Sequence, residues 1–203
     1  MTEGYIKFNF NWQQKEIRIA NELFLELKAA RTHLYDLGLI GMYPDGIGFG
    51  NISAKIEKSS SFIVTGSATG QFQRLQPMHY SIVSGYSFKE NSINCTGLTK
   101  ASAESLTHAA VYEALPEISA VVHIHSIQLW EKLLNIYPTT SPEIEYGTPR
   151  MAFEVKKLSK EINGRGPNII VMGGHREGIL AFGTNLNEAT SEILNIYNQY
   201  QND

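Results

Sequence analysis

The first long pattern along the chain has the period of a helix. Between residues 13 and 37, apolar residues recur three or four positions apart, which is the spacing of one helix face. These residues are Ile17, Ala20, Leu23, Phe24, Leu27, Ala30, Leu34 and Leu37. Two glycines, Gly38 and Gly41, follow, and glycine commonly ends a helix. The spacing therefore predicts a helix over residues 13–37.

Short runs rich in β-branched residues follow, and they predict strands. Residues 50–56 and 61–65 flank a polar turn and predict a hairpin. Residues 79–88 and 93–96 predict a second hairpin across a turn at 89–92. The segment SAVVHIHS, residues 119–126, is short and almost continuously apolar, so it predicts a buried strand.

Helical patterns are interspersed with these strands. Residues 102–115 predict a helix with Ser102 as its N-cap, and Pro116 ends it. Further helices are expected over 128–135, 150–162 and 187–200, a proline-rich loop over 137–149, and strands over 168–172 and 178–182. Hairpins mixed with helices predict an α/β protein with three layers, an α/β/α sandwich whose central sheet is largely antiparallel. No repeat or linker divides the chain, so we expect one domain over residues 1–203.

Composition narrows the class of protein. Of the 203 residues 42% are apolar and 18% are charged, which is typical of a globular protein. A net charge of −3 argues against nucleic acid as the main partner. Cys95 is the only cysteine, so no disulfide can form within the chain. The sequence has neither a membrane-spanning apolar stretch nor the apolar core of a signal peptide, so we expect a cytoplasmic protein that does not bind membranes.

The pair His123 and His125 is the strongest chemical signal. Residues i and i+2 of a strand point to the same side of a sheet, so both imidazoles can contact one metal ion. The alternative is a pair of histidines that only form hydrogen bonds at a strand end. A third ligand could be His175, which lies in the glycine-rich loop GGHREG. Glu104 could bind a metal or move a proton, and with His108 one helical turn later it forms a rival metal-binding pair.

Two clusters of small residues could bind an anion. GFGNIS, residues 48–53, contains Asn51, and TGSATG, residues 65–70, begins with Thr65, Gly66 and Ser67. Both clusters lie beside predicted strands and are rich in backbone N–H groups and polar side chains, which can hold a phosphate. Ordinary turn formation is the alternative explanation for each cluster.

The order of these motifs resembles one protein family. The segments GNIS, TGSATG, KASAE, HAAVYEALPEISAVVHIHS and a late histidine before GILAFG together resemble the class II aldolase/adducin family, and in particular fuculose-phosphate aldolases. The resemblance covers residues 17–197 and is most specific over 100–126.

The resemblance implies a chemistry for these residues. It implies a divalent metal, typically zinc, held by His123, His125 and His175, and it implies that Glu104 is the catalytic acid or base. Asn51, Thr65, Gly66, Ser67 and Ser102 match positions that hold a substrate phosphate. It further implies a homotetramer with active sites between subunits. The expected reaction is retro-aldol cleavage of a sugar phosphate through a metal-stabilised enediolate.

Three departures from the family pattern leave alternatives open. Ser102-Ala103-Glu104 replaces the usual two serines before the glutamate and resembles the methylthioribulose-phosphate dehydratase branch. A gapless alignment backwards from Gly178 places Glu177, instead of His175, at the third ligand position, although His175 completes a three-histidine site. The loop 137–149 carries Glu143, Glu145 and Tyr146 without a clear alignment. A dehydratase, a decarboxylase and a non-catalytic adducin-like interaction domain therefore remain alternatives to an aldolase.

Overall fold

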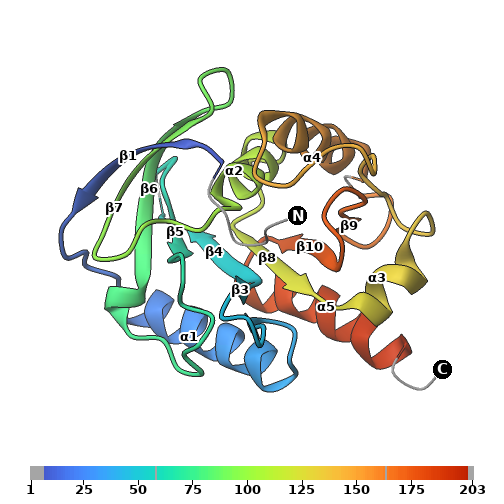
Figure 1. The fold of residues 1–203 in the computed structure, drawn as a ribbon, viewed down its shortest axis with the longest axis horizontal. Coiled ribbons are helices and arrows are strands. Elements are labelled where there is room, and N and C mark those ends of the chain that lie inside the picture. The colour runs from blue at the N-terminus through green and yellow to red at the C-terminus, as the bar shows by residue number, and fades with distance from the viewer. Residues whose placement is uncertain (1–6, 58, 163, 201–203) are drawn as a thin grey trace.

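A mixed sheet lies at the centre of the molecule (Figure 1). The computed structural model describes residues 7–57, 59–162 and 164–200, and within them eight strands pair in the order β1-β7-β6-β5-β4-β8-β10-β9. The strands are β1 (Asn9–Gln14), β4 (Asn51–Lys55), β5 (Phe62–Thr65), β6 (Tyr80–Ser87), β7 (Ser92–Gly97), β8 (Ala120–His125), β9 (Ile169–Val171) and β10 (Gly178–Gly183). Only β1 and β7 pair in parallel among these strands, so the sheet is largely antiparallel, as predicted.

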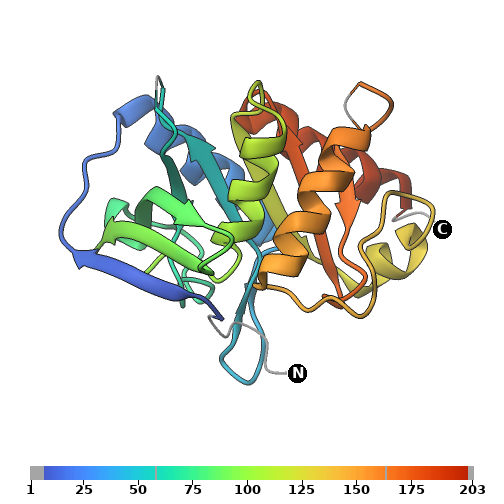
Figure 2. The same cartoon turned by 90° about the horizontal axis from the view of Figure 1, so that it is seen from above.

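Helices cover both faces of this sheet, which confirms the three-layer α/β/α arrangement (Figure 2). Helices α2 (Ser105–Ala114) and α4 (Pro149–Ile162) lie side by side on one face. Helices α1 (Asn21–Asp36) and α5 (Leu186–Tyr200) lie on the other face, with α3 (Ile127–Leu133) packed against α5. A short 3₁₀ turn, Pro77–His79, precedes β6, and β2 (Gly41–Met42) and β3 (Gly48–Phe49) form a separate two-stranded ribbon.

The central strand β8 contributes to both hydrophobic cores. Its six residues are all buried, because helices cover both faces of the sheet. Ala120, Val122 and Ile124 pack into the core under α1 and α5, whereas Val121 packs into the core under α2 and α4. Side chains alternate along a strand, so the histidines at positions 123 and 125 extend the row that begins with Val121. The two histidines therefore face the α2 layer at the end of β8.

The start of the predicted helix over 13–37 is wrong. Helix α1 begins at Asn21, and Asn9–Gln14 forms strand β1 instead. Strand β1 pairs with β7 along its whole length, and the Trp12 indole N–H donates to the Gly97 carbonyl at 3.0 Å. Only positions 13 and 14 of the predicted helix lie in this strand, and their pairing with β7 overrides the local pattern. Ile17 and Ala20 match the helical spacing but lie in residues 15–20, which form neither helix nor strand between β1 and α1.

The position of Ser102 also differs from the prediction. Helix α2 begins at Ser105 and Glu104 occupies the N-cap position, so Ser102 is not the N-cap. The Ser102 hydroxyl accepts a hydrogen bond from the Glu104 amide at 3.3 Å, and the Ser102 carbonyl accepts one from the Ser105 amide at 3.1 Å. These bonds form a turn ahead of the helix. The two hairpins, the strand β8 and the three later helices agree with prediction within a few residues at their ends.

Candidate metal centre and active site

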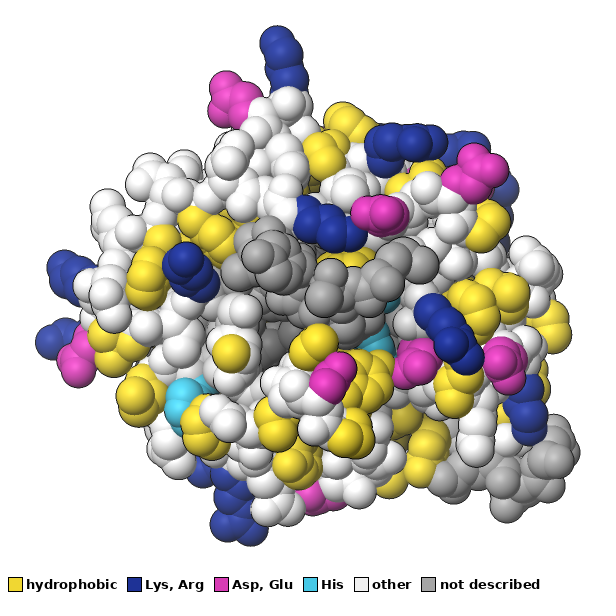
Figure 3. All heavy atoms as spheres, viewed as in Figure 1, with side chains coloured by type: hydrophobic (Ala, Val, Ile, Leu, Met, Phe, Trp, Pro, Cys, Tyr) yellow, Lys and Arg dark blue, Asp and Glu magenta, His cyan; other side chains and the backbone are white. Residues whose placement is uncertain are grey.

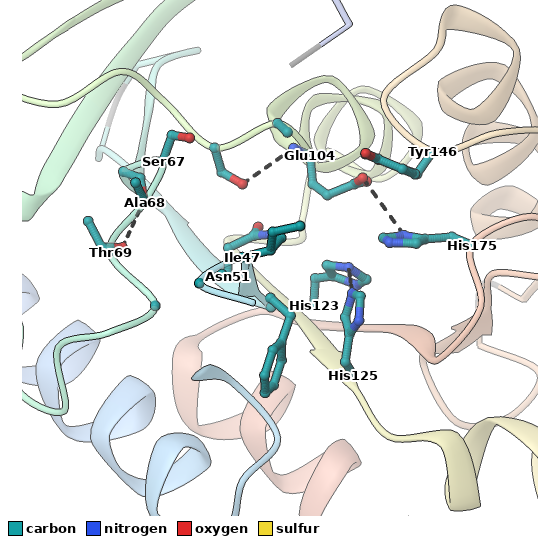
Figure 4. A pocket seen from close by; sticks show the side chains of 18 residues that line it. Ile47, Asn51, Ser67, Ala68, Thr69, Glu104, His123, His125, Tyr146 and His175 are labelled. Atoms are coloured by element: carbon teal, nitrogen blue, oxygen red, sulfur yellow. Dashed lines mark hydrogen bonds and ion pairs between the residues drawn. The ribbon is translucent and has the colours of Figure 1, made fainter. Parts of the chain in front are cut away.

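Three histidines from distant parts of the chain meet at one end of the sheet (Figure 4). His123 and His125 project from the end of β8, and His175 comes from the loop between β9 and β10. The candidate ligand atoms of the three side chains all lie within 4.8 Å of one another. All three side chains are at least 97% buried. This group could hold one metal ion, and it contains His175 but not Glu177.

Hydrogen bonding and burial keep His123 and His125 in a protonation state that can bind a metal. The His123 Nδ1 atom lies 3.2 Å from the Ile179 carbonyl oxygen, which can only accept, so Nδ1 carries the proton and Nε2 keeps its lone pair. That Nε2 faces the His125 Nε2 atom at 3.1 Å. Burial, and then the neighbouring His175, lowers the pKa of both His123 and His125 well below 6.5. Both imidazoles are therefore neutral at pH 7, which is the form that binds metals.

Glu104 approaches the histidines from the start of α2. Its Oε1 atom lies 3.8 Å from His175 Nδ1, and its Oε2 atom accepts a hydrogen bond from the Thr107 hydroxyl at 2.8 Å. The side chain is 4% exposed. The carboxylate therefore has one oxygen held by the helix and the other directed toward the histidine cluster, where it can reach a ligand in the cavity (Figure 4).

His108 does not belong to this cluster, so the rival pairing with Glu104 finds no support. Its Nδ1 atom lies 2.7 Å from the Ser53 hydroxyl, which in turn lies 2.7 Å from the Tyr112 hydroxyl. This network lies fully buried between α2 and the sheet. Desolvation lowers the pKa of His108 to about 3, so the side chain is neutral at pH 7.

A cavity of about 430 Å³ opens over the histidines and Glu104. Its remaining lining is mostly small residues, together with two apolar side chains and one tyrosine: Gly46, Ile47, Gly48, Phe49, Gly50, Asn51, Gly66, Ser67, Ala68, Thr69, Gly70, Ser102, Ala103 and Tyr146. The Asn51 side-chain oxygen is buried and has no hydrogen-bond partner among the described residues. Thr65 is not in this lining. Its hydroxyl instead accepts a hydrogen bond from the Ile52 amide at 3.2 Å. The structure thus brings Asn51, Gly66, Ser67 and Ser102 to the cavity and leaves Thr65 behind them.

Residues 66–73 are called the cavity loop below, and the first five of them, 66–70, form one wall of this cavity. Arg31, fully buried on α1, donates to four carbonyl oxygens of the loop. The acceptors are Thr69, Gly70, Phe72 and Gln73. Ala68 adopts a positive φ of 59° within the loop. A buried guanidinium therefore shapes this wall from behind, a role that the pattern of α1 did not reveal because arginine usually lies on the exposed side of a helix.

Tyr146 is a site residue that sequence reasoning left without a role. Its ring stacks on His175 with centroids 4.5 Å apart and an interplanar angle of 24°. Glu145 instead forms an ion pair with Lys7 at 2.9 Å, and Glu143 is exposed. The proline-rich loop 137–149 has no hydrophobic period, so no local signal separates the tyrosine from its two acidic neighbours.

The distribution of charged side chains on the surface agrees with the small net charge of the chain. On the face shown in Figure 3, acidic and basic side chains are interspersed, and small areas of histidine surface are visible close to the middle. None of the helices in the described part of the chain combines the length and apolar character that a bilayer crossing requires.

Comparison with known proteins identifies a family and a shared fold. Residues 29–199 match the family model described as the class II aldolase and adducin N-terminal domain. The chain belongs to this family. The crystal structure of L-fuculose-1-phosphate aldolase from Thermus thermophilus superposes with a TM-score of 0.66 at 20% identity, over 90% of this chain and 92% of that one. The sugar-phosphate aldolase from Thermotoga maritima gives 0.64 at 16% identity, over 89% and 92%. These structures share the class II aldolase fold.

A shorter stretch of the chain is similar to a further protein. Methylthioribulose-1-phosphate dehydratase from Leptospira interrogans serogroup Icterohaemorrhagiae serovar copenhageni is 31% identical over 81 residues. The match covers 39% of this chain and only about a third, 32%, of the length of that relative.

Proposed function

We propose that this protein is a metal-dependent lyase that cleaves a small phosphorylated hydroxycarbonyl compound by a retro-aldol reaction. His123, His125 and His175 would hold one divalent metal, with zinc as the first candidate. The observation that carries the proposal is the convergence of three buried histidines and one buried carboxylate on a single cavity. Buried titratable groups gathered around one cavity are a feature of functional sites, so such a cluster is expected to serve a ligand.

The donor set fits a catalytic metal. Three protein ligands leave one coordination position open for a substrate, as in catalytic zinc sites. When bound, the metal supplies a Lewis acid that stabilises negative charge on substrate oxygens. The chain itself contributes the proton transfer: Glu104 lies beside the histidines, and its Oε1 atom would take or return a proton at the substrate. Thr107 keeps the Glu104 carboxylate oriented during this transfer.

The phosphate of the substrate would bind at the opposite wall of the cavity. Asn51, Ser67 and Ser102 bring polar side chains to this wall, which Gly66 and Gly70 of the cavity loop also line. None of the described residues that line the cavity is a lysine or an arginine. Affinity for phosphate would therefore come from the neutral N–H and O–H donors of side chains such as Asn51 and Ser67. Thr65 would support this wall indirectly by ending β5.

Metal content and turnover test the proposal together. The purified parent protein is expected to contain about one divalent ion per chain by elemental analysis, and a His123→Ala/His125→Ala variant is expected to contain none. Glu104→Gln should keep the metal and lose turnover of a cleaved sugar phosphate by about 10²- to 10⁴-fold. Glu161→Gln, which changes an exposed glutamate on α4, is the matched control and should behave like the parent. A parent protein that binds no divalent ion would overturn the proposal and favour a non-catalytic adducin-like domain.

A dehydratase is the second candidate, and two observations favour it. Ala103 lines the cavity between Ser102 and Glu104, where aldolases of the family commonly have a second serine. The 81-residue match to a methylthioribulose-1-phosphate dehydratase adds to this. Mass spectrometry of the product separates the two reactions: a dehydratase yields one product lighter than the substrate by one water, whereas an aldolase yields two fragments.

The quaternary structure and extent of the enzyme belong to the same proposal. The family resemblance supports a homotetramer with active sites between subunits. Each subunit would consist of one domain over residues 1–203. Light scattering coupled to size-exclusion chromatography tests the tetramer, and a monomeric, active enzyme would contradict it.

A further inference from the structure

A tyrosine and a glutamate lie behind one of the histidines, on the side away from the cluster. The Tyr43 hydroxyl lies 2.9 Å from His125 Nδ1 and donates to Glu177 Oε2 at 2.6 Å. Tyr43 directly follows β2, and its amide donates to the Ile47 carbonyl at 2.8 Å, so the ribbon of β2 and β3 holds it in place. Glu177 comes from the loop that also carries His175. Two loops that are far apart in sequence therefore meet at His125.

The direction of these hydrogen bonds decides where the proton of His125 lies. The Tyr43 hydroxyl is the donor to Glu177 Oε2, so the tyrosine proton points toward Glu177. The Tyr43 oxygen is then left to accept, and the His125 Nδ1 atom must be its donor. His125 Nε2 consequently keeps its lone pair, and it faces the His123 Nε2 atom at 3.1 Å. Two lone pairs at this distance repel each other, and a cation bound by both removes the repulsion.

The backbone of Glu177 adopts a strained conformation. Its φ is +74°, in the left-handed region where glycine is favoured and a side chain is strained. Its carbonyl accepts the Ser126 amide at 3.0 Å, so the strained backbone is tied to the end of β8. A glycine here would relieve the strain, yet the chain has a carboxylate that contacts Tyr43. Strain of this kind persists where the side chain serves a function.

We infer that Tyr43 and Glu177 are positioning residues that hold His125 with its proton on Nδ1 and its Nε2 lone pair toward the metal. A hydrogen bond to the second nitrogen of a ligating histidine fixes its ring and increases its basicity as a ligand. The glycine-rich loop thus acts twice on the cluster: His175 packs against the His125 ring at 4.7 Å between centroids, and Glu177 acts on its far side through Tyr43. The inference rests on the proposed function only in that the three histidines bind a metal.

Metal affinity, measured without substrate, tests this inference. The dissociation constants of Zn²⁺ and Co²⁺ are measured by competition with a chromogenic chelator for the parent, Tyr43→Phe, Glu177→Gln and Glu177→Gly. Tyr43→Phe and Glu177→Gly are expected to bind both metals about 10- to 100-fold more weakly. Glu177→Gln should lie between these variants and the parent, because its amide oxygen can still accept from Tyr43. Asp45→Asn is the matched control, since Asp45 is an exposed carboxylate in the turn of the same ribbon.

Thermal unfolding of the metal-free proteins separates positioning from a merely structural role. Glu177→Gly should raise the midpoint temperature through relief of strain while it weakens metal binding, whereas a structural residue would lower both. Parent-like affinity in Tyr43→Phe and Glu177→Gly, with a parent that binds metal, would overturn this inference and leave the proposed function standing. A parent that binds neither metal would overturn both.

Discussion

The buried His108 makes the protein sensitive to acid. Desolvation lowers its pKa in the folded protein to about 3, whereas in the unfolded chain it returns to about 6.5. Below pH 6.5 the unfolded chain therefore binds a proton at this histidine, whereas the folded protein does not. The free energy of unfolding falls as the pH is lowered from 6.5 to about 3. Each pH unit in this window costs about 1.4 kcal/mol. Between pH 6.5 and pH 5, His108 alone should thus remove about 2 kcal/mol from the free energy of unfolding.

Urea denaturation between pH 5 and pH 7, with a chelator present, measures this effect. In His108→Gln the slope of the unfolding free energy against pH should be smaller than in the parent by about 1.4 kcal/mol per pH unit, which corresponds to one proton. His123 and His125 also have lowered pKa values, but they are present in both proteins and cancel in the comparison. Ser53→Ala removes the hydrogen-bond partner of His108 and leaves the buried imidazole, so it should lower stability but keep the parental slope. Equal slopes in the parent and in His108→Gln would refute the reasoning.

Three further changes test the cavity and its supports. Gly70→Ala would place a Cβ atom 2.1 Å from the Gly41 carbonyl oxygen, so we expect a loss of about 3 kcal/mol in chemical denaturation, and a parental midpoint would contradict this steric argument. Arg31→Met leaves the carbonyls of the cavity loop without their donor and should cost about 3 kcal/mol by the same measurement, with an unchanged stability as the contrary result. Tyr146→Ala removes the ring stacked on His175 and should weaken metal binding about 2- to 10-fold in chelator competition. Tyr146→Phe keeps the stacked ring and should bind metal more tightly than Tyr146→Ala, and equal affinities of these two variants would contradict the role of the ring.

Local patterns predicted the parts of the fold that local physics controls. The hairpin strands β4 and β5 pair across a short polar turn, so their alternation and their turn lie in one stretch of sequence. Strand β1 could not be found in this way, because its partner β7 lies about 80 residues further along the chain and nothing in residues 9–14 identifies that partner. The helical spacing around Ile17 was accidental, since a few apolar residues match a period of 3.6 without forming a helix.

The candidate site divides in the same manner. The sequence alone indicated that His123 and His125 share one side of a strand, because side chains alternate with a period of two whatever surrounds them. It also indicated Glu104 at the start of a helix. The folded chain was needed to show that His175 joins the cluster, that Glu177 contacts Tyr43, and that Tyr146 stacks on His175. These choices depend on the backbone angles of loops and on which loops meet in space, and a linear pattern of residues contains neither.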